Sequence, residues 1–315
     1  MTEKLYLGVD LGGTNIKAAL VTAKGDLLQE ASVSTALPRS AQSVCDDIAA
    51  LCTQLATDAE VSGIGVGCPG TVDGRIVRYS NNLNWHDFAM ADYLEQKIGL
   101  PVVLANDANA AALGEALAGC AKGAESAVIL TLGTGIGGGI VLNGKLLTGY
   151  TGAAAEPGHM VVRDTPDAPL CTCGRHGCLE AYASATALIR LTNDAMAAHP
   201  ESTLHSFAQK EGTVSGRTAF DAAQAGDAVA QQVVDEYIHG LAVGVANLVN
   251  VFFPEVVGLS GGVANQGENL LAPLRQQVDA LVFGHDFAAK KTRISTCTLG
   301  YRAGVIGAAL LAKEI

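Results

Sequence analysis

Residues 5–15 read LYLGVDLGGTN, an apolar run with the length of a β-strand that breaks into a polar turn. The paired glycines Gly12 and Gly13 leave the backbone N–H groups of the turn open to close approach by a phosphate. The Thr14 hydroxyl can donate a hydrogen bond to the same phosphate, and Asp10 can hold a metal ion or its water. Taken alone, a Gly-Gly pair after a strand is weak evidence for phosphate binding and favours an ordinary hairpin turn.

A second unit of the same kind lies about half the chain away. Residues 126–132 are another apolar run, and residues 140–142 resume the apolar pattern before an Asn143-Gly144 hairpin turn. Between them lie the phosphate-binding candidates Gly133, Thr134, Gly135, Gly137 and Gly138. The repetition predicts two similar lobes that each offer one phosphate-binding turn to a shared cleft. A further pair, Gly261 and Gly262, follows another apolar strand, where such a lobe could receive a purine.

The segment 101–119 combines a strand pattern with an alanine-rich helix pattern. Residues 102–105 form the predicted strand, and Asn106 and Asp107 stand where the helix would begin. The helix macrodipole favours a charged carboxylate at that position. Asn and Asp are also common helix caps, and in isolation this pair favours a cap.

Residues 156–180 carry a cluster of metal-binding side chains and two acidic residues, namely Glu156, His159, Cys171, Cys173, Cys178 and Glu180. Three thiols that follow one imidazole at such close spacing are enough for a closed Cys₃His zinc site. Disulfides are the competing interpretation, but three clustered cysteines leave one unpaired, and no signal peptide directs the chain to an oxidising compartment. We therefore expect a structural zinc ion, which would also fix the directions of the two glutamates.

Length and composition fit this picture without specifying an activity. The chain has 315 residues, 49% of them apolar, which is enough for a large core and about two medium domains. A net charge of −11 argues against a nucleic-acid surface, and the uncharged stretch 126–143 contains too many glycines for a membrane helix. We expect a cytoplasmic protein that binds neither nucleic acid nor membrane. Five further cysteines are expected to be buried thiols: Cys45, Cys52, Cys68, Cys120 and Cys297.

Taken together, these residues resemble the ROK family of bacterial sugar kinases and sugar-responsive repressors, within the actin and hexokinase superfamily. The matching pieces are DLGGT (10–14), ND (106–107), LGTGIGGG (132–139), EPGH (156–159), the cysteine stretch that ends at Glu180, and SGG (260–262). They follow the family's order over nearly the whole chain. The resemblance implies an α/β, two-lobed actin/hexokinase-like (ribonuclease H-like) fold with an inter-lobe cleft and a zinc-bound loop.

The resemblance also implies domain limits. An N-terminal α/β lobe would span residues 1–119, with the C-terminal helix 303–315 packing back on it. A C-terminal α/β lobe with the zinc loop would span residues 120–302. We further expect a homodimer and closure of the two lobes on the sugar.

Roles for single residues follow from the same resemblance. Asp107 looks like the catalytic base, and the sugar-binding residues look like Asn106, Asp107, Glu156, His159 and Glu180. Gly70 and Asn82 stand where relatives line the sugar site, although both are also typical of turns. The zinc ligands would be His159, Cys171, Cys173 and Cys178. ATP, which would bring Mg²⁺ with it, would contact Asp10, Gly12, Gly13, Thr14, Asn15, Lys17, Gly133, Thr134, Gly135, Gly137, Gly138, Gly261 and Gly262.

Two positions in that set are less clear-cut. Asn15 stands where many relatives carry lysine, so its contribution to nucleotide binding is in doubt. Lys17 is a nearby cation, but a solvated lysine after a turn is the commoner case.

Three functions are compatible with the family: an ATP-dependent hexose kinase, a repressor and a non-catalytic sugar sensor. The repressor is disfavoured because the first turn begins a few residues after Met1 and leaves no room for a helix-turn-helix domain. A sensor would be expected to have lost its base or a phosphate turn, and both are present. The run from Asn82 to Trp85 resembles glucokinases, which predicts phosphorylation of glucose at its 6-hydroxyl. A kinase for N-acetylmannosamine or N-acetylglucosamine is the alternative.

Overall fold

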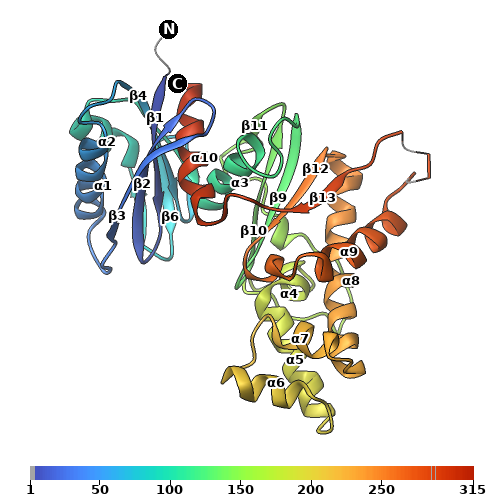
Figure 1. The fold of residues 1–315 in the computed structure, drawn as a ribbon. Helices are drawn as coiled ribbons and strands as arrows, with labels where there is room; N and C mark the ends of the chain where they lie inside the picture. Colours follow the sequence, from blue (N-terminus) through green and yellow to red (C-terminus); the bar gives the residue numbers. More distant parts are fainter. Residues whose placement is uncertain (1–3, 285, 288) are drawn as a thin grey trace. The chain divides into compact units, whose positions relative to one another are not determined.

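The computed structural model describes residues 4–284, 286–287 and 289–315, and it shows an α/β protein (Figure 1). The chain divides into two compact units. Unit 1 contains Met1–Ile129, Gly139–Ala155 and Cys297–Ile315, and unit 2 contains Leu130–Gly138 and Glu156–Thr296. The predicted domain limits, 1–119 and 120–302, remain predictions, and residues 1–3 of the first lie outside the described residues.

Unit 1 is built on a five-stranded sheet with the strand order β3-β2-β1-β4-β8. Its strands are β1 (Leu5–Leu11), β2 (Asn15–Thr22), β3 (Leu27–Ser34), β4 (Val61–Cys68) and β8 (Val102–Asn106). β1 and β2 form an antiparallel hairpin, whereas β4 runs parallel to both β1 and β8. The strand predicted at 5–9 is therefore present and is two residues longer at its C-terminal end.

The two faces of this sheet are covered by different helices. Leu7, Val9 and Leu11 of β1 belong to the same buried cluster as residues of α1 (Ala41–Leu55) and α2 (Met90–Ile98). The alternate residue Tyr6 packs with α10 (Ala303–Leu311), which lies beside β1 in Figure 1. Gly8 also faces α10, because a Cβ on it would lie 1.9 Å from the Val305 carbonyl oxygen. Asp10, two residues further on, points the same way.

Three further strands and one helix complete the part of unit 1 that matters below. A small antiparallel sheet has the strand order β5-β6-β7 and contains β5 (Thr71–Asp73), β6 (Ile76–Ser80) and β7 (Trp85–Phe88). Helix α3 (Asp107–Leu117) begins directly after β8, as the alanine-rich pattern predicts.

A second five-stranded sheet has the order β11-β10-β9-β12-β13. Its strands are β9 (Ser126–Leu132), β10 (Ile136–Leu142), β11 (Lys145–Leu146), β12 (Val256–Ser260) and β13 (Arg293–Thr296). The helices of unit 2 are α4 (Glu180–Ala183), α5 (Ala185–Ala198), α6 (Leu204–Glu211), α7 (Thr218–Gln224), α8 (Ala228–Phe252) and α9 (Glu268–Leu281). Short 3₁₀ turns are η1 (Pro157–His159), η2 (Gly262–Gln266), η3 (Gly300–Arg302) and η4 (Ala312–Glu314).

One strand boundary differs from the sequence prediction. The strand expected to resume at residue 140 begins at Ile136, so Gly137, Gly138 and Gly139 lie within β10 and not in the turn. Glycine serves there as a small residue: a Cβ on Gly139 would lie 2.5 Å from the Cβ of Ala112. Close packing and turn formation both select glycine, and the sequence alone does not separate them.

The cysteine prediction is wrong for two of the five scattered residues. Cys45, Cys52 and Cys68 are buried, whereas Cys120 and Cys297 are half-buried, with their sulfurs 3.8 Å apart. The 177 residues that separate this pair hide its proximity from the sequence.

Among the helices of the described residues, none has both the length and the apolar character needed to cross a bilayer.

Candidate functional site

The first glycine-rich turn connects β1 to β2 and is closed by its own backbone. The Gly12 N–H donates to the Asn15 carbonyl at 2.9 Å, and the buried Thr35 hydroxyl donates to the Gly12 carbonyl at 2.7 Å. Gly13, Thr14 and Asn15 are exposed. Among the described residues, no heavy atom outside the immediate backbone would lie within 4 Å of a Cβ on Gly13. The tip of this turn is therefore accessible to a ligand.

Unit 1 also contains the predicted site residues Asp10 and Asp107, whose charges interact. Burial raises the pKa of Asp10, the positive charge of Lys17 lowers it, and the charge of Asp107 raises it again, with a net increase. Gly304, in the first turn of α10, would place a Cβ 2.9 Å from the Asp10 carboxyl carbon, so Asp10 lies against the positive end of that helix.

Asp107 is the first residue of α3 and is half-buried. Burial raises its pKa, and the hydrogen bond from the Ala108 N–H, at 2.9 Å, offsets only part of that increase. The proton affinity of this carboxylate therefore exceeds that of an exposed aspartate.

Asn106 confirms the helix-cap interpretation and also makes a longer-range contact. Its side-chain oxygen accepts from the N–H groups of Ala108 and Asn109 at 2.9 and 3.2 Å. Its amide donates to the Gly70 carbonyl at 2.9 Å. Gly70 has a φ of +103°, and a Cβ on it would lie 2.1 Å from the Tyr79 carbonyl oxygen, so glycine is required there. Asn106 thus joins the start of α3 to the segment after β4.

Asn82 is exposed in the turn between β6 and β7. The buried side chains of Leu83 and Trp85 anchor that turn in the core of unit 1.

Lys17 and Asn15 lie on β2. Asn15 is exposed at the start of the strand, and the Lys17 ammonium lies 5.2 Å from the ring centre of Tyr301. This cation–π contact gives Lys17 a partner within unit 1.

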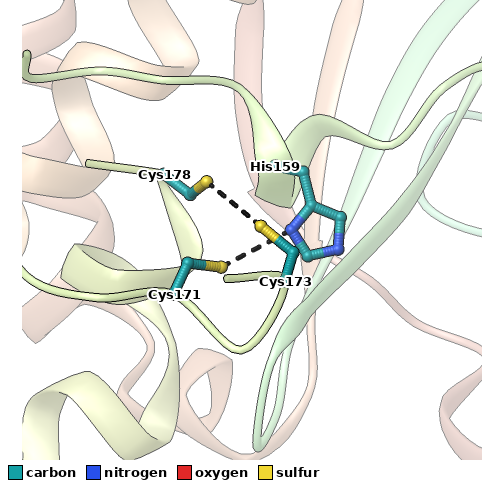
Figure 2. Close-up of side chains that lie close together, drawn as sticks. All are labelled: His159, Cys171, Cys173 and Cys178. Carbon is teal, nitrogen blue, oxygen red and sulfur yellow. Dashed lines mark hydrogen bonds between the residues drawn. The ribbon is translucent and has the colours of Figure 1, made fainter. Parts of the chain in front are cut away.

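In unit 2, His159 and the three clustered cysteines converge (Figure 2). The Cys171 sulfur lies 3.6 Å from His159 Nδ1, the Cys173 and Cys178 sulfurs lie 3.7 Å apart, and the four candidate ligand atoms all fall within 4.8 Å of one another. Tetrahedral zinc, with Zn–S near about 2.3 Å and Zn–N near about 2.0 Å, places two sulfurs roughly 3.8 Å apart and a sulfur–nitrogen pair roughly 3.6 Å apart. The donor set and its spacing therefore fit zinc.

Two features of the loop support this arrangement. Gly174 and Gly177 have φ values of +84° and +80°, and a Cβ on Gly177 would lie 1.9 Å from the Arg163 carbonyl oxygen. The backbone N–H and the guanidinium of Arg175 lower the pKa of the Cys173 thiol to about 6, which favours the thiolate form that binds metal.

Glu180 opens α4 directly after this loop and is only 8% exposed. Its Oε2 accepts from the Ile136 N–H at 3.0 Å, and its Oε1 accepts from the Thr172 hydroxyl at 2.5 Å and from the Cys171 thiol at 3.5 Å. Burial raises the pKa of Glu180, but the donors Thr172, Ile136 and Cys171 outweigh burial and the net pKa is lowered. Glu180 is therefore a fixed, charged acceptor. Glu156, immediately before η1, is exposed.

The second glycine-rich turn is held by several parts of unit 2. The Gly133 N–H donates to the Gly135 carbonyl at 3.0 Å, the Ala185 N–H donates to the Gly133 carbonyl at 2.8 Å, and the Thr186 hydroxyl donates to the Thr134 carbonyl at 2.7 Å. A Cβ on Gly135 would lie 2.3 Å from Glu180 Oε2.

Gly261 and Gly262 lie next to the start of that turn. Gly261 has a φ of +88°, and a Cβ on it would lie 2.4 Å from the Leu132 carbonyl oxygen. The two glycine motifs of unit 2, which begin at Gly133 and Gly261 and so lie 128 residues apart in the sequence, are therefore neighbours in space. Gly137 and Gly138 continue from the turn into β10.

One surface pocket of unit 2 is lined both by Thr134 of the second glycine-rich turn and by Glu180. It is lined by Thr134, Leu170, Cys171, Thr172, Glu180, Ala181, Ser184, Thr186, Ala187 and Arg190. Thr172, Thr186 and Arg190 are absent from the sequence prediction. No glycine pair, cap or metal spacing marks the latter two, and Thr172 is merely the residue between two cysteines.

The ROK family profile matches residues 6–315. The chain belongs to the ROK family. A relative named glucokinase, from Halalkalibacterium halodurans, is 39% identical over 100% of this chain and 96% of its own length. The crystal structure of a ROK family glucokinase from Streptomyces griseus, in complex with glucose and AMPPNP, has a TM-score of 0.76 and 37% identity, and covers 99% of this chain and 100% of that one. A ROK hexokinase from Thermus thermophilus has a TM-score of 0.82 and 37% identity over 98% of both chains. The predicted family and the actin/hexokinase-like fold class are thereby confirmed.

Proposed function

We propose that this ROK protein is an ATP-dependent sugar kinase that phosphorylates a hexose at its 6-hydroxyl, with glucose as the preferred sugar. The observation that carries the proposal is Asp107: a half-buried carboxylate of raised pKa at the start of a helix, in the same unit as an accessible Gly-Gly turn. Full-length relatives named glucokinase, and a glucokinase crystallised with glucose and AMPPNP, support it.

The reaction asks little covalent chemistry of the protein. The 6-hydroxyl oxygen attacks the γ-phosphorus of ATP, the bond to the ADP oxygen breaks, and the hydroxyl proton passes to a base. Asp107 is proposed as that base, since its raised pKa increases the affinity of the carboxylate for the proton.

The sugar would be recognised by fixed hydrogen-bonding groups. We propose Asn106, Asp107, Glu156, His159 and Glu180 as direct contacts, with Gly70 and Asn82 contributing from the segments after β4 and β6. Asn106 and Glu180 are already held by hydrogen bonds to backbone groups, so they would need little reorganisation on binding. A wrong epimer would leave such acceptors unpaired, which penalises its binding.

ATP, accompanied by Mg²⁺, would be bound by the two turns and by the glycine pair after β12. The proposed contacts are Asp10, Gly12, Gly13, Thr14, Asn15, Lys17, Gly133, Thr134, Gly135, Gly137, Gly138, Gly261 and Gly262. AMPPNP in the Streptomyces griseus glucokinase supports ATP as the phosphoryl donor.

A zinc ion, when bound by His159, Cys171, Cys173 and Cys178, would cross-link the loop as a closed structural site with no position left for substrate water. Because Nδ1 of His159 faces the cysteines, Nε2 is the ring nitrogen available to a sugar hydroxyl.

A coupled assay of ADP formation with glucose, mannose, N-acetylglucosamine and N-acetylmannosamine tests the proposal. We expect kcat/KM for glucose to exceed that for either N-acetylated sugar by more than about tenfold, which corresponds to about 1.4 kcal/mol. If kcat/KM for an N-acetylated sugar exceeds that for glucose by the same margin, the glucose assignment is wrong and the assignment as a sugar kinase stands. No sugar-dependent ADP with any of the four, despite bound sugar, would favour the non-catalytic sensor.

A homodimer and a cytoplasmic location remain predictions. Light scattering coupled to size-exclusion chromatography will decide the first, and cell fractionation the second.

A further inference from the structure

One peptide unit of the second turn is contacted by both ends of the Cys/His segment. The Ile136 N–H donates to Glu180, which follows the last cysteine, at 3.0 Å. The Ile136 carbonyl lies against Gly158, beside His159, where a Cβ would come within 2.1 Å of the carbonyl oxygen. Ile136 is the first residue of β10 after the Gly133–Gly135 turn, so the position of the turn depends on the position of this segment.

Thr172 completes this arrangement from the other side of Glu180. Its hydroxyl donates to Glu180 Oε1 at 2.5 Å, while Ile136 donates to Oε2. Donors on both oxygens restrict the carboxylate to one orientation, and hydrogen bonds to a charged acceptor are the stronger kind. Thr172 itself is exposed, and the metal-binding pattern requires only the cysteines on either side of it. Its hydroxyl is thus available for a role apart from metal binding.

We propose that Thr172 is a positioning residue: its hydroxyl orients Glu180 so that Glu180 holds the Ile136 peptide, and through it the phosphate-binding turn, while presenting its remaining lone pairs to the sugar. The link from Glu180 to the sugar and nucleotide rests on the proposed function. The link from Thr172 to the turn rests on the hydrogen bonds alone.

A consequence is that sugar binding and nucleotide binding are coupled. A sugar that contacts Glu180 stabilises the orientation that also holds the turn, so glucose should tighten AMPPNP binding. By thermodynamic reciprocity, AMPPNP should tighten glucose binding by the same factor. Loss of the Thr172 hydroxyl should reduce this factor.

The test uses the full chain with bound zinc and three variants. Thr172→Val removes the hydroxyl at nearly constant shape, Thr172→Ser keeps a hydroxyl, and Thr165→Val is the matched control. Thr165 is exposed in the same long loop, and its hydroxyl interacts with the Arg163 guanidinium at 3.1 Å. Zinc content per chain and the melting temperature are measured for every variant.

The first readout is hydrogen–deuterium exchange of the peptide that covers residues 133–138. Thr172→Val is expected to speed exchange of its slowest amide by about tenfold, the scale of a lost hydrogen bond to a charged group. Thr172→Ser should stay within about threefold of the wild type, and Thr165→Val should leave exchange unchanged. Unchanged exchange in Thr172→Val, an equal effect in Thr172→Ser, or loss of zinc from Thr172→Val would each overturn the proposal.

The second readout separates this proposal from the proposed function. Calorimetry of glucose binding with and without AMPPNP and Mg²⁺ should show a coupling factor in the wild type that falls toward one in Thr172→Val, together with a KM for glucose raised about tenfold. If Thr172→Val speeds exchange but the wild type binds neither glucose nor AMPPNP, the proposed kinase function is refuted and the positioning role of Thr172 stands. If Thr172→Val is an active kinase with the wild-type coupling factor, the positioning role of Thr172 is refuted and the kinase function stands.

Discussion

Both glycine-rich turns are accompanied by buried or half-buried carboxyl groups, but the pKa values of these groups are shifted in opposite directions. In unit 1, burial raises the pKa of Asp10 and Asp107, and the donors around Asp107 offset only part of the increase. In unit 2, Glu180 is buried as well, but hydrogen bonds from Thr172 and Ile136 bring its pKa below the ordinary value. Burial raises a carboxyl pKa, and donors to the charged form lower it.

Under the proposed function, the carboxyl groups of the two units have different tasks. A carboxylate with raised proton affinity can accept a proton, whereas a carboxylate that already accepts a hydrogen bond on each oxygen is fixed in orientation and can use its remaining lone pairs to bind hydroxyl groups. The turns also differ in accessibility: the tip of the first is accessible at Gly13, whereas Gly135 of the second packs against Glu180.

The largest expected effect is on catalysis in unit 1. Asp107→Asn should lower kcat by roughly 10² or more, since an amide cannot accept the proton. Glucose affinity measured by calorimetry should stay within a few-fold of wild type, because asparagine keeps the size and the helix-start position. Asp58→Asn, at an exposed residue, is the control. Near-normal turnover in Asp107→Asn would show that Asp107 is not the base. It would also remove the proposed difference in role between Asp107 and Glu180.

Metal removal probes unit 2. Purified protein should contain about one zinc per chain by elemental analysis, and Cys178→Ser should lose it and unfold at a lower temperature, because a structural metal site contributes to folding. Cys52→Ala, which alters a buried cysteine of α1, should keep the zinc. Fully active wild-type protein without zinc would contradict the assignment.

The two turns themselves can be compared by matched substitutions. Gly135→Ala should lower the free energy of unfolding by about 1–3 kcal/mol, since its Cβ would collide with a carboxylate held on both sides. Gly13→Ala should change it by less than about 0.5 kcal/mol. Urea denaturation of both variants gives the difference. Equal destabilisation would show that the second turn is no more constrained than the first.

The smallest effect concerns pH. Because the pKa of Asp107 is raised on folding, the folded protein binds this proton more tightly than the unfolded chain does. The resulting stabilisation is complete below the ordinary pKa near 3.8 and is lost as pH rises through the raised value. The free energy of unfolding of the wild type should therefore fall relative to that of Asp107→Asn as pH rises through this window. A constant difference between the two proteins would show that the pKa is not raised. In the active enzyme, kcat should fall as pH drops through the raised pKa in the enzyme–substrate complex.

Much of this protein was decided within short stretches of sequence. Strand, turn and cap preferences act between near neighbours, so the strand at 126–132, the Asn106 cap and the start of α3 were predictable from a short apolar run and from capping chemistry. The Cys/His set was identifiable for the same reason, because three of its members lie within eight residues. Its convergence to within 4.8 Å is a finding of the structure.

Only the tertiary structure decided which residues far away in the sequence contact these motifs. Glu180 meets Ile136 across 44 residues, Asp10 lies against Gly304 of the last helix, and Gly139 is a glycine because Ala112 approaches it. Such contacts depend on which faces of strands and helices pack together, and glycine looks the same in a sequence whether it permits a turn or a close approach. The opposite pKa shifts of Asp107 and Glu180 arise in the same way, because burial and hydrogen-bond donors are properties of the packed chain and not of the residue.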